Sequence, residues 1–323
     1  LKQVVALQPD SGTARMNLGM GLVMSGETSA GIEELEKAEA LYPESEVATI
    51  KIIKAHLANK SFDEALKASL AYRENHPDSI TAHILLGTSY MTMGDSANAG
   101  KVFEEALVIE PGNISANSGL AAIALQSGDL DKAKGYYRDA IEKHPGALAP
   151  SMNLAAVEHA QGNFDAMQDV LNQAISANPD ALAPRLSLSR FYLKRAQHQK
   201  IIELLSPVRD NNADNPEVRG LLGESELAVG DYTRAVDDLS HFVKLVPKNA
   251  QAHYSLARAY AGDRDRNGYY RELRTVVELD EKHINARTEL IKLMLAEKNT
   301  AEAGEHIEIL KSQAEDQPEV LTL

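Results

Sequence analysis

A spacing of 34 residues between matching positions is the feature that most limits how this chain can fold. When residues 80–113 are aligned with residues 114–147, the apolar, small and turn-forming positions fall in register. The matching pairs are Leu86 with Leu120, Gly87 with Ala121, Gly94 with Gly128, Ala99 with Ala133, Phe103 with Tyr137, Ala106 with Ala140 and Pro111 with Pro145. A fixed period of this length indicates small supersecondary units that bury their apolar faces against neighbouring copies.

The residue types at these positions predict two antiparallel helices in each copy. Two helices approach closely only where one offers Gly or Ala, so Gly87 and Ala99 mark the contact and Phe103 fills the space beside it. Gly94 lies where the first helix must end and the chain must reverse, since Gly accepts positive φ without penalty. Pro111 ends the second helix, because proline disfavours helical geometry in the residue before it.

The same signals divide the whole sequence into repeats. Prolines recur at spacings that are multiples of 34 residues, at Pro9, Pro43, Pro77, Pro111, Pro145, Pro179 and Pro247. Two residues after most of these prolines stands a Ser or Asn, which can cap the next helix. We expect residues 1–11 to end a preceding repeat, nine tandem units to fill residues 12–317, and residues 318–323 to begin another. The nine units are residues 12–45, 46–79, 80–113, 114–147, 148–181, 182–215, 216–249, 250–283 and 284–317.

Two places depart from the pattern. In the unit of residues 250–283, Arg264 stands where the reversing glycine belongs and Tyr269 where a small residue normally permits close packing. We therefore expect residues 262–268 to form a lengthened turn or a bend. Two units earlier, the polar residues 211–215 predict a connector.

The repeated positions resemble the signature of the tetratricopeptide repeat (TPR) family. The matching residues are Leu86, Gly87, Tyr90, Ala99, Phe103, Ala106 and Pro111, with His83 in place of an expected aromatic residue. The resemblance covers the whole chain and implies an all-α fold, a right-handed α-solenoid superhelix of antiparallel helix pairs. Phrases such as Gly-Asp-x-x-x-Ala also resemble bacterial multi-repeat lipoproteins of the exopolysaccharide and exosortase (PEP-CTERM) type.

Composition and motifs argue against several classes of site. The chain has 33 basic and 47 acidic residues, and its net charge of −14 repels phosphate backbones, so we expect no nucleic-acid partner. Because cysteine is absent, disulfides and thiolate metal sites are excluded. No apolar stretch is long enough for a membrane span in this fragment. Nucleotide, serine-hydrolase and metalloprotease motifs are also missing, so we predict no catalysis, no cofactor and no metal site.

The family resemblance implies that the first helices of successive units line a concave groove for a protein or peptide partner. Carried over by position, the partner-binding residues are Met16, Met20, Met24, Ile50, Lys54, Ile84, Met91, Met152, Arg190, Lys194, Tyr254, Arg258 and Lys292. Within one unit such residues are three or four apart, which places them on one helical face.

The two halves of this groove predict different partners. Methionine is flexible, so the first half suits an apolar partner of variable sequence. The basic residues of the second half favour an acidic or extended anionic ligand. Two other interpretations stay open: the methionines pack on a neighbouring repeat, and the basic residues are solvated or paired with glutamates such as Glu224.

We predict a non-catalytic protein-binding scaffold. The chain lacks the Lys and Asn clamp of chaperone-tail binders and the Asn ladder of sugar-transferase arrays. It begins on Leu inside a repeat, so we expect it to be part of a longer protein. The resemblance to lipoproteins implies a periplasmic or outer-membrane location and a role in organising an exopolysaccharide or protein-sorting system. The alternatives are a substrate-presenting arm of a larger transferase and a cytoplasmic regulatory adaptor.

Overall fold

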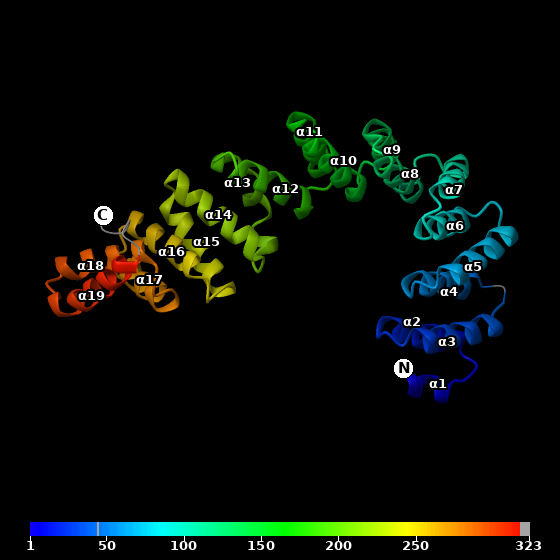
Figure 1. Cartoon of the computed structure of the whole chain (residues 1–323), viewed down its shortest axis with the longest axis horizontal. Coiled ribbons are helices and arrows are strands. Elements are labelled where there is room, and N and C mark those ends of the chain that lie inside the picture. The colour runs from blue at the N-terminus through cyan, green and yellow to red at the C-terminus, as the bar shows by residue number, and fades with distance from the viewer. Residues whose placement is uncertain (44, 317–323) are drawn as a thin grey trace. The chain divides into compact units, whose positions relative to one another are not determined.

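The computed structural model describes residues 1–43 and 45–316. Within these residues the chain forms 19 α-helices and two short 3₁₀-helices, with no strand. Successive helices pack in pairs, which confirms the predicted all-α solenoid of helix hairpins (Figure 1). The chain divides into two compact units, unit 1 at Leu1–Asn178 and unit 2 at Pro179–Leu323. Residues 318–323, predicted to begin another repeat, lie outside the described residues.

Unit 1 holds eleven helices. In its hairpins the even-numbered helix comes first in the chain and is called the first helix below. The helices of unit 1 are α1 Lys2–Leu7, α2 Gly12–Met24, α3 Thr28–Leu41, α4 Glu46–Ala58, α5 Phe62–Asn75, α6 Ile80–Thr92, α7 Ser96–Ile109, α8 Ile114–Gln126, α9 Leu130–Lys143, α10 Leu148–Ala160 and α11 Phe164–Ala177.

Unit 2 continues the same alternation. Its helices are α12 Leu182–Leu193, α13 His198–Leu205, the 3₁₀-helices η1 Ser206–Val208 and η2 Asp210–Asn212, α14 Pro216–Val229, α15 Tyr232–Leu245, α16 Ala250–Gly262, α17 Arg266–Leu279, α18 Ile284–Ala296 and α19 Thr300–Asp316. Residues 211–215, predicted as a polar connector, begin inside η2.

Local sequence signals explain where the helices begin and reverse. Asn113 caps α8, because its Oδ1 accepts hydrogen bonds from the backbone N–H groups of Ser115 and Ala116 at 3.0 and 3.1 Å. At the turn after α6, Gly94 has a φ of 80°, the left-handed conformation that glycine adopts without strain. Capping and turn chemistry therefore fix the ends of the hairpins.

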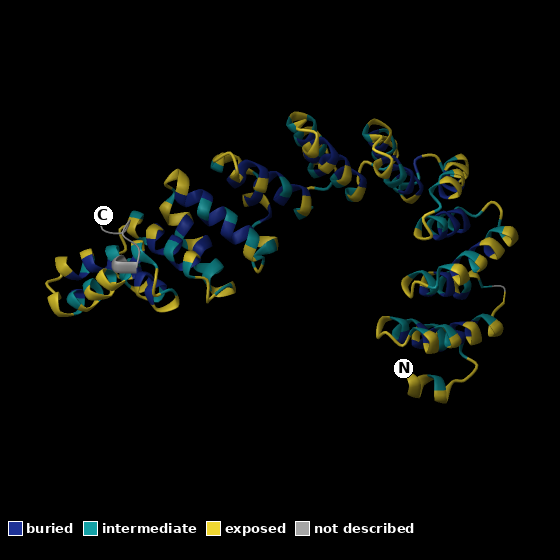
Figure 2. Ribbon diagram, viewed as in Figure 1, coloured by how far each residue is buried: buried dark blue, intermediate teal, exposed yellow. Residues whose placement is uncertain are grey.

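The core of each hairpin lies between its two helices, where the dark blue residues of Figure 2 gather. Phe103 of α7, only 2% exposed, shows why small residues are needed there. A Cβ added at Gly87 of α6 would lie 2.5 Å from the Phe103 ring, and one added at Gly119 of α8 would lie 2.4 Å from it. The ring thus packs directly on the backbones of two successive first helices.

The predicted lengthened turn at residues 262–268 is wrong. Helix α16 ends at Gly262 and α17 begins at Arg266, which leaves three residues between them, as between α6 and α7. Arg264 adopts a φ of 65° in place of the usual glycine. Asp265 caps α17 by accepting from the backbone N–H of Gly268 at 3.0 Å. The hairpin keeps its geometry because an arginine accepts the strained conformation.

A proline interrupts the second helix of the first hairpin in unit 2. Helix α13 stops at Leu205, and Pro207 lies in η1 immediately after it. Proline removes a backbone donor and clashes with the preceding turn, so an α-helix cannot run through it unbroken. The two 3₁₀-helices carry the chain from there to α14.

Candidate functional site

The predicted methionine stripe lies on α2 of unit 1. Met16 and Met20 are half-buried and pack against Leu35, Ile52 and Ala55, which belong to α3 and α4. Met24 points to solvent and is 85% exposed. Two of the three methionines therefore contribute to packing between the first two hairpins, and one is free to meet a partner.

The remaining predicted residues of unit 1 lie on three first helices, α4, α6 and α10. Ile50 packs against the cluster around Ile53, and the half-buried Ile84 and Met91 pack against the cluster around Phe103. Met152 of α10 is half-buried, and Lys54 of α4 is exposed. Among the described residues Lys54 forms no ion pair.

In unit 2, Arg190 of α12 is already bound to a partner. Its Nε and Nη2 donate to the two carboxylate oxygens of Glu217 at 2.6 and 2.7 Å. This two-bond geometry is strong for an exposed pair and holds α12 to the start of α14. Lys194, one turn further along, is exposed and is the C-cap residue of α12.

Tyr254 of α16 belongs to a polar cluster with the next first helix. Its hydroxyl donates to Glu289 Oε1 at 2.9 Å, and the Tyr269 hydroxyl donates to Glu289 Oε2 at 2.7 Å. Burial and the Glu289 carboxylate raise the pKa of Tyr254 to about 12 and also raise the pKa of Tyr269. Both tyrosines therefore stay protonated near neutral pH and act as donors.

A hollow of about 510 Å³ opens on the first helices of unit 2. We call it the unit 2 hollow. Its apolar lining includes Leu193 of α12 with Gly220, Leu221, Leu227 and Ala228 of α14, and its polar lining includes Glu224 and Arg258. Of the residues predicted to bind a partner, Arg258 lines this hollow. Lys292 of α18 is exposed and makes no ion pair with any residue in the described part of the chain.

Sequence reasoning did not predict the hollow, although one of its lining residues stands out in the sequence. The fifth position of each repeat carries Leu186 in α12 and Tyr254 in α16, but Gly220 in α14. A comparison of one position across the repeats would have singled out this glycine.

It also missed a row of buried cationic side chains at the fourth position of the repeats in unit 2. These are Arg185, Arg219, His253 and Arg287, which are 3 to 9% exposed. Each bonds the backbone carbonyl six residues earlier, in the turn that precedes its helix. Each also bonds a group 19 residues later, on the second helix. The row thus joins three segments within every hairpin of unit 2.

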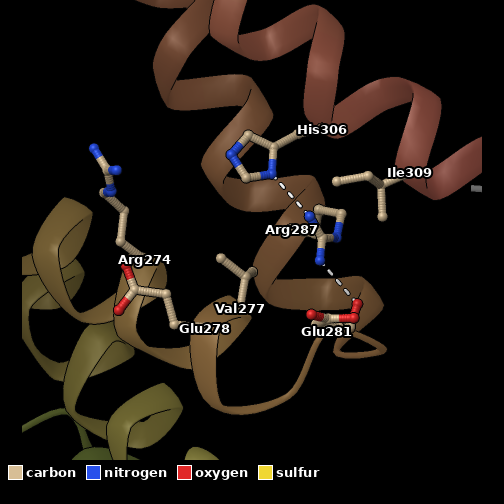
Figure 3. A pocket seen from close by; sticks show the side chains of 7 residues that line it. All are labelled: Arg274, Val277, Glu278, Glu281, Arg287, His306 and Ile309. Carbon is tan, nitrogen blue, oxygen red and sulfur yellow. Dashed lines mark hydrogen bonds between the residues drawn. The ribbon is translucent and has the colours of Figure 1, made fainter.

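Figure 3 shows the last member of this row. Arg287 of α18 donates to the backbone oxygen of Glu281 at 2.8 Å, and its other terminal nitrogen lies 2.8 Å from His306 Nδ1 on α19. Burial, together with the charge of Arg287, lowers the pKa of His306. The neutral imidazole therefore accepts the hydrogen bond from Arg287.

Two buried glutamates at the same repeat position differ in their surroundings. Glu158 of α10 is 2% exposed and accepts hydrogen bonds from Arg138 at 2.9 Å and Asn163 at 2.8 Å. Glu226 of α14 is 1% exposed and lies beside the buried Asp238. Burial and the Asp238 carboxylate raise the pKa of Glu226 to about 8.

These groups suit binding and packing. In the part of the chain that the structure describes, no three His, Asp or Glu side chains are placed to hold a metal ion. Within the same residues, none of the helices is both long and apolar enough to span a bilayer. The candidate site is a surface formed by first helices, and in unit 2 it includes the unit 2 hollow.

Comparison with known families agrees with this architecture. One tetratricopeptide repeat model matches residues 50–114, 119–181 and 221–266, and a second matches residues 90–147 and 158–224. The chain belongs to the tetratricopeptide repeat family. A search of the curated proteins finds no match.

Several solved structures share the repeat fold. YrrB, described as a TPR protein with an unusual peptide-binding site, is 18% identical over 58% of this chain and 96% of its own, with a TM-score of 0.47. TTC0263, a thermophilic TPR protein of Thermus thermophilus, is 18% identical over 57% of this chain and 100% of its own, with a TM-score of 0.46. MamA is 17% identical over 51% of this chain and 91% of its own, with a TM-score of 0.42. These are likenesses of fold alone.

Proposed function

We propose that this chain is a non-catalytic scaffold that holds a protein or peptide partner against the faces of its first helices. The observation that carries the proposal is the unit 2 hollow, which is lined by apolar side chains and by the polar groups of Glu224 and Arg258. Concave apolar surfaces with a few placed polar groups are the usual form of a binding site. The family membership of the chain supports the same role.

Exposed apolar side chains on first helices of each unit, taken separately, support partner contacts outside the hollow. Met24 is 85% exposed, Leu125 36%, Leu193 41% and Leu295 47%. They lie near the ends of α2, α8, α12 and α18. Repeated exposure near the same end of first helices is the pattern expected of a surface that a partner covers.

A peptide selection tests this proposal. A display library of random peptides is selected on the whole chain, and the recovered peptides are measured against two variants. Leu193→Glu places a charge on a first helix, and Val108→Glu is the control on the second helix α7, where Val108 is 83% exposed. We expect Leu193→Glu to weaken binding roughly tenfold or more, because it buries an unpaired charge, and Val108→Glu to leave it unchanged. Failure to recover any peptide, or loss of binding only with Val108→Glu, would contradict the proposal.

We further propose that the array works in the bacterial envelope, in the periplasm or at the outer membrane, where it organises an exopolysaccharide or protein-sorting system. The repeat phrases that resemble bacterial lipoproteins support this location. The test is the full reading frame together with cell fractionation. A lipidated Cys upstream and recovery with membranes are expected. A catalytic domain in the same frame would instead indicate a transferase arm, and recovery in the cytosol would indicate a regulatory adaptor.

A further inference from the structure

Gly220 of α14 lines the unit 2 hollow together with Phe242 of α15. A Cβ added at Gly220 would lie 3.1 Å from Cζ of Phe242, so the Phe242 ring of α15 lies directly below the position where a side chain would begin. The same position carries Leu186 in α12 and Tyr254 in α16. Leu221 and Leu227 also line the hollow, so its apolar part can receive a side chain from outside.

Two charged groups of opposite sign line this hollow. Glu224 and Arg258 occupy the same position in successive repeats. Glu224 Oε1 accepts a hydrogen bond from the Ser255 hydroxyl, which holds the carboxylate in place. Its Oε2 and the Arg258 guanidinium have no hydrogen-bond or ion-pair partner among the described residues. Arg190, at the same position one repeat earlier, differs because Glu217 neutralises it.

These charges limit which partner can cover the hollow. An entirely apolar segment would remove water from Arg258 and Glu224 without replacing their hydrogen bonds, which is costly. An entirely acidic segment would be repelled by Glu224, and an entirely basic one by Arg258. A segment that carries both signs satisfies both groups.

We propose that the unit 2 hollow selects a peptide segment of mixed charge. An apolar side chain of this segment enters the apolar part of the hollow, an acidic side chain binds Arg258, and a Lys or Arg side chain binds Glu224. The inference rests on the proposed scaffold function and names the chemistry of the partner. It assigns specificity to two residues, Glu224 of α14 and Arg258 of α16.

The test uses the same random-peptide display library on the whole chain and on charge-reversed variants. On the unaltered chain we expect peptides that combine an apolar, an acidic and a basic residue. Arg258→Glu is expected to weaken these peptides roughly tenfold or more and to select peptides with a basic residue in place of the acidic one. Lys244→Glu, which makes the same charge change at an exposed position of α15, is the matched control and should leave binding unchanged.

A second pair of variants tests the apolar part of the unit 2 hollow. Ala228 lines the hollow and is exposed, so Ala228→Phe fills the mouth without disturbing the core. Ala296→Phe adds the same ring at the same repeat position on α18, away from the lining of the hollow. We expect only Ala228→Phe to weaken binding. Circular dichroism of both variants checks that they are folded.

The outcomes separate this inference from the scaffold proposal. Peptides that lose binding with Leu193→Glu but bind Arg258→Glu and Glu224→Lys as tightly as the unaltered chain would overturn the mixed-charge inference and leave the scaffold proposal standing. Equal weakening by Ala228→Phe and Ala296→Phe would also overturn it. Recovery of no peptide at all would contradict both proposals.

Discussion

The residue at the fourth position of the repeat, and the hydrogen bonds that it makes, differ between unit 2 and most of unit 1. In α8 and α10 this position holds Asn117 and Ser151, which bond only a carbonyl four residues earlier, at the start of their own helix. In unit 2 it holds a buried Arg or His that bonds both the preceding turn and the second helix. Arg15, in the first hairpin of unit 1, makes the same two kinds of bond. The same helix-hairpin fold is thus stabilised by two different sets of side-chain hydrogen bonds at this position.

The comparison shows that repeats of one fold need not share one balance of forces. Unit 1 has 3 arginines and unit 2 has 12. The hairpin around Phe103 is held by close packing of small residues, whereas the hairpin of α14 and α15 adds a buried ion pair between Arg219 and Asp238 to such packing. Buried charges are costly to remove singly, because the partner left behind stays desolvated. Unit 2 should therefore respond more strongly to charge-removing mutations and to pH.

The largest expected effect is that of Arg219→Ala. Asp238 is fully buried, and Arg219 supplies its closest cation. Removing this cation leaves the carboxylate beside Glu226 with only the longer ion pair to Arg209 at 3.7 Å, so we expect a loss of about 3 to 5 kcal/mol in the stability of unit 2. Hydrogen exchange read helix by helix through mass spectrometry measures the loss in α14 and α15.

The matched control is Asn117→Ala, at the same position in unit 1. Asn117 Oδ1 is buried without a hydrogen-bond partner, so its removal should change the stability of unit 1 by less than about 1 kcal/mol. Equal effects of the two variants would show that the two units do not differ in the way described.

The second expected effect is a loss of stability in unit 2 as the pH rises. Because the pKa of Glu226 is raised from 4.5 to about 8, the folded state holds its proton more tightly than the unfolded state. The stabilisation is complete below pH 4.5 and is lost as the pH rises through about 8. We expect a loss on the order of 3 kcal/mol. Urea unfolding followed by hydrogen exchange in α14 at several pH values measures it.

Glu226→Gln provides the control for this prediction. The amide cannot ionise, so the stability of α14 should become flat across the same pH range. If the stability of α14 still changes with pH in Glu226→Gln, another group causes the pH dependence.

The third and smallest expected effect concerns packing in unit 1. Gly87→Ala places a methyl group 2.5 Å from the Phe103 ring, which must shift, and we expect a loss of about 1 to 3 kcal/mol. Gly135→Ala meets nothing within 4 Å and should stabilise α9 by about 0.5 to 1 kcal/mol. Thermal unfolding of both variants checks the contrast, and a stabilising Gly87→Ala would contradict the close-packing account of this hairpin.

Local chemistry made the helix-pair fold predictable from the sequence. Pro111 and Gly94 recur with their neighbours at a constant spacing, and each has a direct backbone consequence. The turn at Arg264 could not be predicted in this way, because the surrounding hairpin forces an arginine into the conformation that glycine normally takes. The end of α13 differs, because Pro207 is visible in the sequence and an α-helix cannot run through proline unbroken.

The candidate site was less predictable for a different reason. The recurrence of Arg185, Arg219 and Arg287 is visible in the sequence, but their partners are not. One partner is a backbone carbonyl, that of Leu204, which no residue type reveals. The predicted groove set stays a prediction, although Arg190 is tied to Glu217 and Met16 packs in the core.

The binding role of the first helices is tested most directly by a hydrogen-exchange footprint. A peptide recovered on the whole chain is added at saturating concentration, and exchange is compared with and without it. We predict slower exchange in α14 and α16, whose residues line the unit 2 hollow, and no change in α7. Protection of the second helices alone, with α14 and α16 unchanged, would contradict the account.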